Sequence, residues 1–328
     1  MKLSISILSL TSVGALASWT KNINYRSPSE HHPGLGISLH KVNKRNTLDK
    51  RFDASQLNFT HGVASGDPYS DSVILWTRCA PAFEAVDDNS TVSGYVPLYN
   101  HGPEQVSTAP VCVEYQVSLT DDFADLAASG TAYTSSDVDY TVKVEAKGLQ
   151  PFTRYYYQFN VCGSDYKSML GRTKTTPAPD DMSSEVGLAV YSCSNYPFGF
   201  FNAYGNPVRK DSVDYVLHLG DYIYEYAGDG DYGYGYSLDR VPAPYGKIIF
   251  TLYDYRARHS AYRTDQDLVL SHANFPWIPV WDDHEVADNT YRDGSSELNN
   301  TEDSFVQDGG VAVEQRKMNA VRAYFEWM

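Results

Sequence analysis

Three apolar segments in the second half of this 328-residue chain end in residues that can bind metal ions or transfer protons. The first segment ends at 192–195 (Ser-Cys-Ser-Asn), the second at 220–221 (Gly-Asp) and the third at 282–285 (Asp-Asp-His-Glu). A single Asp after a strand often caps a helix. Three such ends on neighbouring strands favour one shared metal site over three independent caps.

The residue types at these ends also indicate the chemistry. Carboxylates suit hard cations, a thiolate suits softer ones, and a tyrosinate suits a strongly Lewis-acidic ion such as Fe(III). Asp221 between two cations would stay ionised, and two neighbouring ions commonly activate water and hold a phosphate ester. His284, beside Asp283, can hydrogen-bond to a phosphoryl oxygen or protonate a leaving group.

The segments that carry these residues predict an α/β half. The apolar runs over 185–193, 213–221 and 277–285 alternate with helical segments and predict a mostly parallel sheet with right-handed crossovers. Ligands bind beyond the carboxyl ends of such strands. The first run is continuously apolar, which predicts burial on both faces. A helical pattern covers 251–275 and another covers 313–328.

The first half has a different pattern. Strand-like runs over 72–78, 110–119, 140–149 and 153–162 are broken by turn residues at the spacing of a sandwich. The predicted fold class is therefore α+β with two domains. These are a fibronectin-like or Ig-like β-sandwich (52–175) and, after a linker (176–184), the first half of an α/β sandwich (185–328).

The N-terminus is typical of a secreted protein. Residues 1–17 have a positive start, a short apolar run and a small-residue cleavage site, as in a signal peptide. Residues 18–51 form either a propeptide, cut after the dibasic pair at 50–51, or a plain leader. Asn58, Asn89 and Asn299 lie in N-x-[ST] sequons and are predicted glycosylation sites.

Charge and hydropathy exclude two classes of partner. The net charge of −15 argues against nonspecific nucleic-acid binding, which needs a basic surface. No segment reaches the roughly 18 apolar residues of a membrane helix. With the signal peptide, this predicts a secreted protein. We also expect a monomer, although charge and hydropathy do not report the oligomeric state.

Four cysteines in an oxidising compartment predict disulfides. Two disulfides would force Cys193 to bond across the domains, whereas one disulfide would leave a free thiol in each half. Cys79, Cys112 and Cys162 lie in the first half, and the strand-like surroundings of Cys112 and Cys162 favour that pair.

Several longer motifs together resemble one known family. They lie at 61–78, at 191–195 ("YSCSN"), at 218–226 ("HLGDYIYEY"), at 255–285 (ending in "WDDHE") and at 323–328 ("AYFEWM"). They resemble the alkaline phosphatase D (PhoD-like) family, calcineurin-like metallophosphoesterases with an N-terminal β-sandwich. The resemblance covers nearly everything after the leader. It implies hydrolysis of phosphate mono- and diesters at a site holding Fe(III) and Ca(II).

The resemblance also implies roles for particular residues. Cys193 and Tyr224 would bind Fe(III), and Asp221 would bridge iron and calcium. Asp283 takes the place of a metal-binding Asn, and His284 that of the catalytic histidine. Asn195 would support the site. The other two tyrosines of the motif at 218–226, Tyr222 and Tyr226, are expected to pack on the other side of the turn.

One departure from the family pattern affects these expectations. The pattern continues with further metal-binding histidines, but this chain contains no histidine after His284. A truncated gene model or fragment is expected. The alternative is a secreted protein that binds metal or phosphate without turnover. A half sheet of this kind should expose an apolar face, and we expect this length to aggregate when expressed alone.

Overall fold

The computed structural model describes residues 28–34, 52–81, 110–182, 185–227, 240–244, 246–292, 294–295 and 312–328. The predicted signal peptide, the dibasic pair at 50–51 and the sequons at Asn89 and Asn299 lie outside these residues. Asn58, in the one remaining sequon, lies within the described residues and is exposed.

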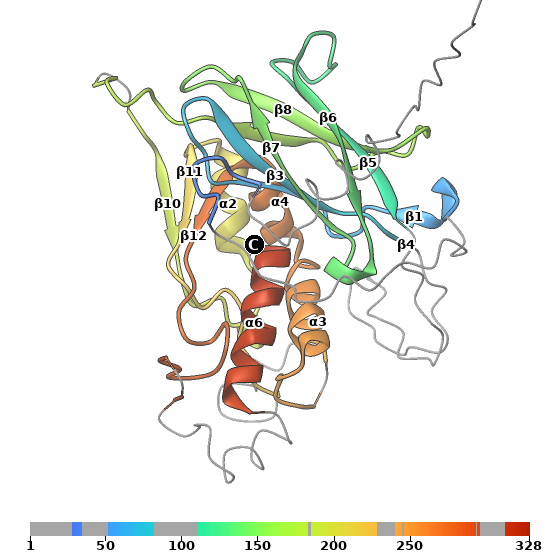
Figure 1. Ribbon diagram of the computed structural model, residues 1–328. Coiled ribbons are helices and arrows are strands. Elements are labelled where there is room, and N and C mark those ends of the chain that lie inside the picture. The colour runs from blue at the N-terminus through green and yellow to red at the C-terminus, as the bar shows by residue number, and fades with distance from the viewer. Residues whose placement is uncertain are drawn as a thin grey trace, which may run out of the picture.

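One six-stranded sheet runs through both halves of the chain (Figure 1). Its strands, in spatial order, are β10 (Leu188–Tyr191), β11 (Tyr215–His218), β12 (Pro276–Pro279), β2 (Val63–Gly66), β3 (Ser72–Arg78) and β7 (Thr141–Lys147). The first three strands are parallel, as predicted, and β12 pairs in parallel with β2. The pairs β2–β3 and β3–β7 are antiparallel. The pairing of β12 with β2 therefore joins the two halves.

A second sheet of four antiparallel strands belongs to the first half. It consists of β6 (Leu126–Thr134), β5 (Val111–Ser118), β8 (Arg154–Val161) and β9 (Gly171–Lys174). Buried side chains of this sheet, such as Val113 and Phe159, share one core with Val73 and Leu75 of β3. A short pair, β1 (Leu57–Asn58) and β4 (Ala80–Pro81), lies beside it. The fibronectin-like or Ig-like character and the domain boundaries stay predictions.

The helices pack beneath the large sheet (Figure 1). They are α2 (Asn202–Lys210), α3 (Leu252–Tyr262), α4 (Gln266–Asn274) and α6 (Val313–Trp327), with short 3-10 turns η1 (Ala54–Gln56), η2 (Ser136–Val138) and η3 (Tyr196–Phe198). The segment 251–275 forms two helices because Asp265 accepts the backbone N–H groups of Asp267 and Leu268 and so starts a new helix. Among the described helices, none has the length and apolar character needed to cross a membrane.

The sheet of the second half is covered on one face. Ala189, Val216 and Trp277 are buried there, in a core shared with helical residues. On the opposite face Leu188 and Val190 are 48% and 54% exposed. The prediction that 185–193 is buried on both faces is therefore wrong, because in the described part of the chain the helices pack against one face. The expected exposed apolar face is present.

The cysteines form one disulfide. Cys112 and Cys162 are bonded with an S–S distance of 2.08 Å, which confirms the favoured pair. Cys79 is a buried free thiol and Cys193 an exposed one. Each half thus has one free thiol.

Candidate metal centre

The loops after β10 and β11 bring a thiol and a carboxylate together. Cys193 and Asp221 both have left-handed backbones, with φ values of 60° and 55°. The N–H of Cys193 donates to the carbonyl of Gly220 (3.2 Å), and that of Ser194 donates to the carbonyl of Asp221 (2.8 Å). These bonds join the two loops, and the Cys193 thiol lies 3.5 Å from Oδ2 of Asp221.

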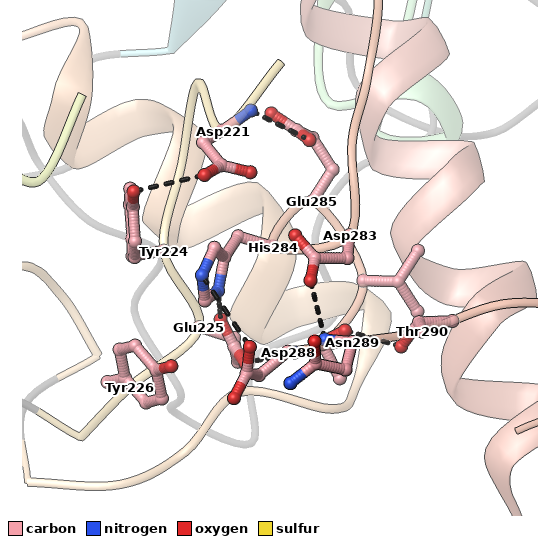
Figure 2. Close-up of polar contacts among 12 residues, drawn as sticks. Asp221, Tyr224, Glu225, Tyr226, Asp283, His284, Glu285, Asp288, Asn289 and Thr290 are labelled. Atoms are coloured by element: carbon pink, nitrogen blue, oxygen red, sulfur yellow. Dashed lines mark hydrogen bonds and ion pairs between the residues drawn. The ribbon is translucent and has the colours of Figure 1, made fainter. Parts of the chain in front are cut away.

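Glu285 connects the end of β11 to the loop after β12 (Figure 2). Its buried carboxylate accepts the backbone N–H groups of Asp282 (2.7 Å), Asp221 (3.2 Å) and Tyr222. Burial raises the pKa of Glu285 to about 7, although these N–H groups favour its charged form. Sequence reasoning missed this positioning role, since the donors are backbone groups and two of them lie in another segment.

The carboxylates meet His284 in a cluster. Ligand atoms of Asp221, Asp283 and His284 all lie within 4.8 Å of one another. Oδ2 of Asp221 also accepts the Tyr224 hydroxyl (3.1 Å), but its buried Oδ1 has no hydrogen-bond partner. Burial raises the pKa of Asp221 despite the nearby His284. A buried carboxylate oxygen without a partner is costly, and a cation would satisfy it. The donor set thus fits a metal ion.

The tyrosines of this turn differ in their surroundings. Burial, together with the charges of Asp221 and Cys193, raises the pKa of Tyr224 well above its ordinary value. A strongly Lewis-acidic ion would be needed to ionise it. Tyr222 is buried in the core, as expected, and its hydroxyl lies 3.0 Å from Nε2 of His272. The packing of Tyr226 on the other side of the turn was a wrong prediction, because its ring lies edge-on to His284, 5.4 Å between centroids.

His284 is held by three neighbours (Figure 2). Its Nδ1 lies 2.9 Å from Oε2 of Glu225, and its ring stacks on Tyr224 with centroids 4.2 Å apart. Its Nε2 lies 3.9 Å from Asp288. Burial disfavours the imidazolium, but the Glu225 hydrogen bond and the surrounding carboxylates outweigh it and raise the pKa of His284 to about 9.

Glu225 is a second residue that sequence reasoning missed. Its side chain is 4% exposed, and besides contacting His284 it accepts the N–H of Asp288 (2.6 Å). Its position directly after Tyr224 in the same turn was the available signal. Glu225 therefore links the turn after β11 to the loop after β12.

The remaining predicted residues lie on the same loops. The Asp283 carboxylate accepts the N–H of Asn289 (2.5 Å). Asn195 follows Cys193 by two residues, and its N–H donates to the Cys193 carbonyl (3.0 Å). The structure thus brings Cys193, Asp221, Tyr224, Asp283 and His284 together at the strand ends, and the supporting role of Asn195 stays a prediction.

Two family models match the chain. The PhoD-like phosphatase model matches residues 188–328, and the model of the N-terminal domain of PhoD-like phosphatases matches residues 44–177. The chain belongs to the PhoD-like phosphatase family.

Two relatives show how much of a PhoD-like protein this chain represents. Alkaline phosphatase D of Bacillus subtilis (strain 168) is 39% identical over 275 residues, which cover 84% of this chain and 42% of that protein. A solved structure of PhoD is 36% identical with a TM-score of 0.66, covering 85% of this chain and 47% of the other. The chain therefore spans less than half the length of the PhoD-like relatives it matches.

Proposed function

We propose that this chain is a secreted, metal-dependent phosphoester hydrolase of the PhoD type, acting on phosphate mono- and diesters. The observation that carries the proposal is the buried, unpartnered Oδ1 of Asp221 within a cluster that includes Asp283 and His284. Family membership supports the reaction class. Secretion rests on the N-terminal sequence and on the exposed sequon at Asn58.

Four residues would hold the cations. Cys193 and Tyr224 would bind Fe(III), and Asp221 would be shared by Fe(III) and Ca(II). Asp283 would be a further ligand of Ca(II). Bound cations would polarise the phosphoryl group and lower the pKa of a water molecule. Thiolate and tyrosinate suit iron, and carboxylates suit calcium.

The protein's own residues position and protonate the substrate. Contact with Glu225 at Nδ1 helps to raise the pKa of His284, and its Nε2, which lies 3.9 Å from Asp288, is the atom that would give a proton to the leaving oxygen. Glu225 fixes the ring through Nδ1, and the rings of Tyr224 and Tyr226 flank it. Glu285 holds the backbone that carries Asp221.

The test compares Asp221→Asn with Asp211→Asn. Both aspartates have left-handed backbones, with φ values of 55° and 47°, which Asn tolerates. Hydrolysis of a nitrophenyl phosphodiester and bound metal are measured in the 328-residue protein. We expect Asp221→Asn to lower hydrolysis by more than about 100-fold and to lose the bound metal. The visible iron–tyrosinate band of the iron-loaded protein should disappear with it.

Asp211→Asn is the control, and two other results would contradict different parts of the proposal. Asp211, which is exposed and pairs with Arg154 and Arg172, should tolerate the change. Wild-type metal content and turnover in Asp221→Asn would refute the site. Metal binding by the wild-type protein without turnover would instead support a protein that binds metal or phosphate and does not hydrolyse it.

A further inference from the structure

The turn after β11 is held in place mainly by side chains from other segments. Residues 222–226, which include Tyr224 and Glu225 (Figure 2), form neither helix nor strand. The carbonyl of Glu225 accepts the backbone N–H of Ile249 (3.1 Å). Other backbone groups of this turn, which a strand would pair in a sheet, must be satisfied by side chains from outside it.

Arg258 of α3 bonds to two carbonyls of this turn. Its guanidinium donates to the carbonyl of Tyr224 through Nη1 and to that of Tyr226 through Nη2 (3.0 Å). Nε donates to the carbonyl of Ala243 (2.9 Å). Burial lowers the pKa of Arg258 to about 10, so its guanidinium is charged at neutral pH. Because the donors form a rigid planar fork, Arg258 fixes the spacing of the carbonyls that it contacts.

Tyr262 lies one helical turn after Arg258 and therefore on the same face of α3. Its buried hydroxyl oxygen accepts the N–H of Tyr224 (3.2 Å) and the N–H of Tyr196 (3.3 Å). Tyr196 begins η3, in the loop after β10 that also carries Cys193. One hydroxyl thus joins the loops of both proposed iron ligands.

The burial of these two N–H groups makes the Tyr262 hydroxyl important. Tyr196 and Tyr224 are 2% and 9% exposed, and a buried N–H that loses its acceptor is unfavourable. Cys193 also has a left-handed backbone, with a φ of 60°, which persists only where surrounding contacts hold it. The hydroxyl therefore favours the arrangement in which both loops lie against α3.

We propose that Arg258 and Tyr262 are positioning residues of the metal centre, and that this face of α3 sets where Tyr224 lies relative to Cys193. The inference rests on the proposed function, because it takes Cys193 and Tyr224 as the iron ligands. Both positioning residues bond to backbone groups, so they occupy neither the thiol nor the phenol. Groups that orient metal ligands in this way raise metal affinity.

The test compares Tyr262→Phe with Tyr215→Phe in the 328-residue protein. Each change removes one buried hydroxyl and keeps the ring. Tyr215 is 2% exposed, lies at the end of β11 away from Asp221, and donates to the carbonyl of Thr175 (2.7 Å). It is therefore a matched control for any general loss of stability.

The first measurement is amide hydrogen exchange in the metal-free protein, which reports local opening of the chain. In Tyr262→Phe the amides of Tyr196 and Tyr224 lose their acceptor. We expect both to exchange at least about tenfold faster than in the wild-type protein. In Tyr215→Phe both should exchange at the wild-type rate.

The second measurement is titration with Fe(III) citrate, followed by the visible iron–tyrosinate band. Loss of a group that orients a metal ligand typically weakens metal affinity by about 10- to 100-fold. We expect a loss in this range for Tyr262→Phe, with the band recovered at excess iron. Tyr215→Phe should bind iron as the wild-type protein does.

The two measurements separate this inference from the proposed function. Wild-type exchange at Tyr196 and Tyr224 in Tyr262→Phe would overturn the inference. Unchanged iron affinity would also overturn it, since Tyr262 would then hold the loops without positioning a ligand. The absence of an iron–tyrosinate band in the wild-type protein would instead refute the proposed iron site. If Tyr262→Phe does not fold, Arg258→Lys, which keeps the charge and loses the fork, should weaken iron binding in the same range.

Discussion

The pKa of His284 is raised mainly by a carboxylate on a different loop. Glu225 lies in the turn after β11, and His284 lies beyond β12, so their contact exists only once the two strands are paired. The hydrogen bond at Nδ1 fixes which ring nitrogen faces the cluster of carboxylates. Positioning of this kind is a property of the fold.

Glu225→Gln tests this dependence. Removing the charge should lower the pKa of His284 from about 9 toward its ordinary value and reduce kcat for the phosphodiester by about 10- to 100-fold. Bound metal should be unchanged. Steady-state kinetics over a pH series measures the effect, and the alkaline limb should move to lower pH.

Asp288→Asn is the matched control for that experiment. Asp288 also faces His284, but at 3.9 Å and with its side chain 45% exposed, so its loss should change kcat little. A larger loss in Asp288→Asn than in Glu225→Gln would contradict the assigned role of Glu225.

Sequence reasoning found some of these residues and missed others for a physical reason. Asp221 and Asp283 lie in the loops just after β11 and β12, and parallel strands bring their carboxyl ends to one edge. Glu225 and Glu285 act on backbone N–H groups and on a ring from distant segments. No local pattern reports such partners.

At the scale of elements, the closeness of β11 and β12 depends on Gly220. Its φ is 102°, and a Cβ there would lie 2.5 Å from Cβ of Asp282 and 2.7 Å from its backbone nitrogen. Those atoms belong to the loop that carries Asp283 and His284. The loops can approach this closely because residue 220 has no side chain.

Gly220→Ala is therefore expected to combine backbone strain with a steric clash. We expect it to lower the free energy of unfolding by about 3 kcal/mol or more and to reduce metal binding. Gly148→Ala is the control, since Gly148 has φ 73° and no atom within 4 Å of its would-be Cβ. It should cost about 1–2 kcal/mol, the strain alone. Equal losses in denaturant unfolding would show that the close approach is unimportant.

The elements that the sequence predicted are those with a strong local pattern. The runs over 72–78 and 153–162 became β3 and β8, because the Val, Ile, Trp and Thr of the first run and the Tyr, Phe and Val of the second suit a pleated surface. Strand β6 was missed, since its sequence is rich in Ala, Ser and Thr and much of it is exposed. The break between α3 and α4 was missed because Asp265 lies within an otherwise continuous helical pattern.

For the whole molecule, buried neutral histidines couple stability to pH. His218 and His259 are at most 1% exposed, and burial lowers their pKa values to about 4 and about 3. In the unfolded chain a histidine has a pKa near 6.5, so below that pH the unfolded state binds more protons than the folded state. Stability from these residues is therefore present above about pH 6.5 and is lost as the pH falls toward 4.

The free energy of unfolding should therefore depend measurably on pH. Between pH 6.5 and 4.5 each of the two histidines should lower the free energy of unfolding by up to about 1.4 kcal/mol per pH unit, and Glu285, whose pKa is raised to about 7, acts in the opposite sense. Denaturant unfolding at several pH values measures it. Because neither ring nitrogen of His259 has a hydrogen-bond partner, His259→Phe should fold and flatten the slope. A wild-type slope that survives in His259→Phe would rule out a contribution from this residue.

The pairing of β2 with β12 also bears on how the protein is made. Ser65 lies opposite Pro276, so more than 200 residues must leave the ribosome before β2 meets that neighbour. At about 5–20 residues per second, the edge of β2 waits for about 10–40 s. During that time the strand presents unpaired backbone groups that other chains can capture. The fold therefore leaves this strand edge open to other chains during synthesis, independent of any chemistry at the strand ends.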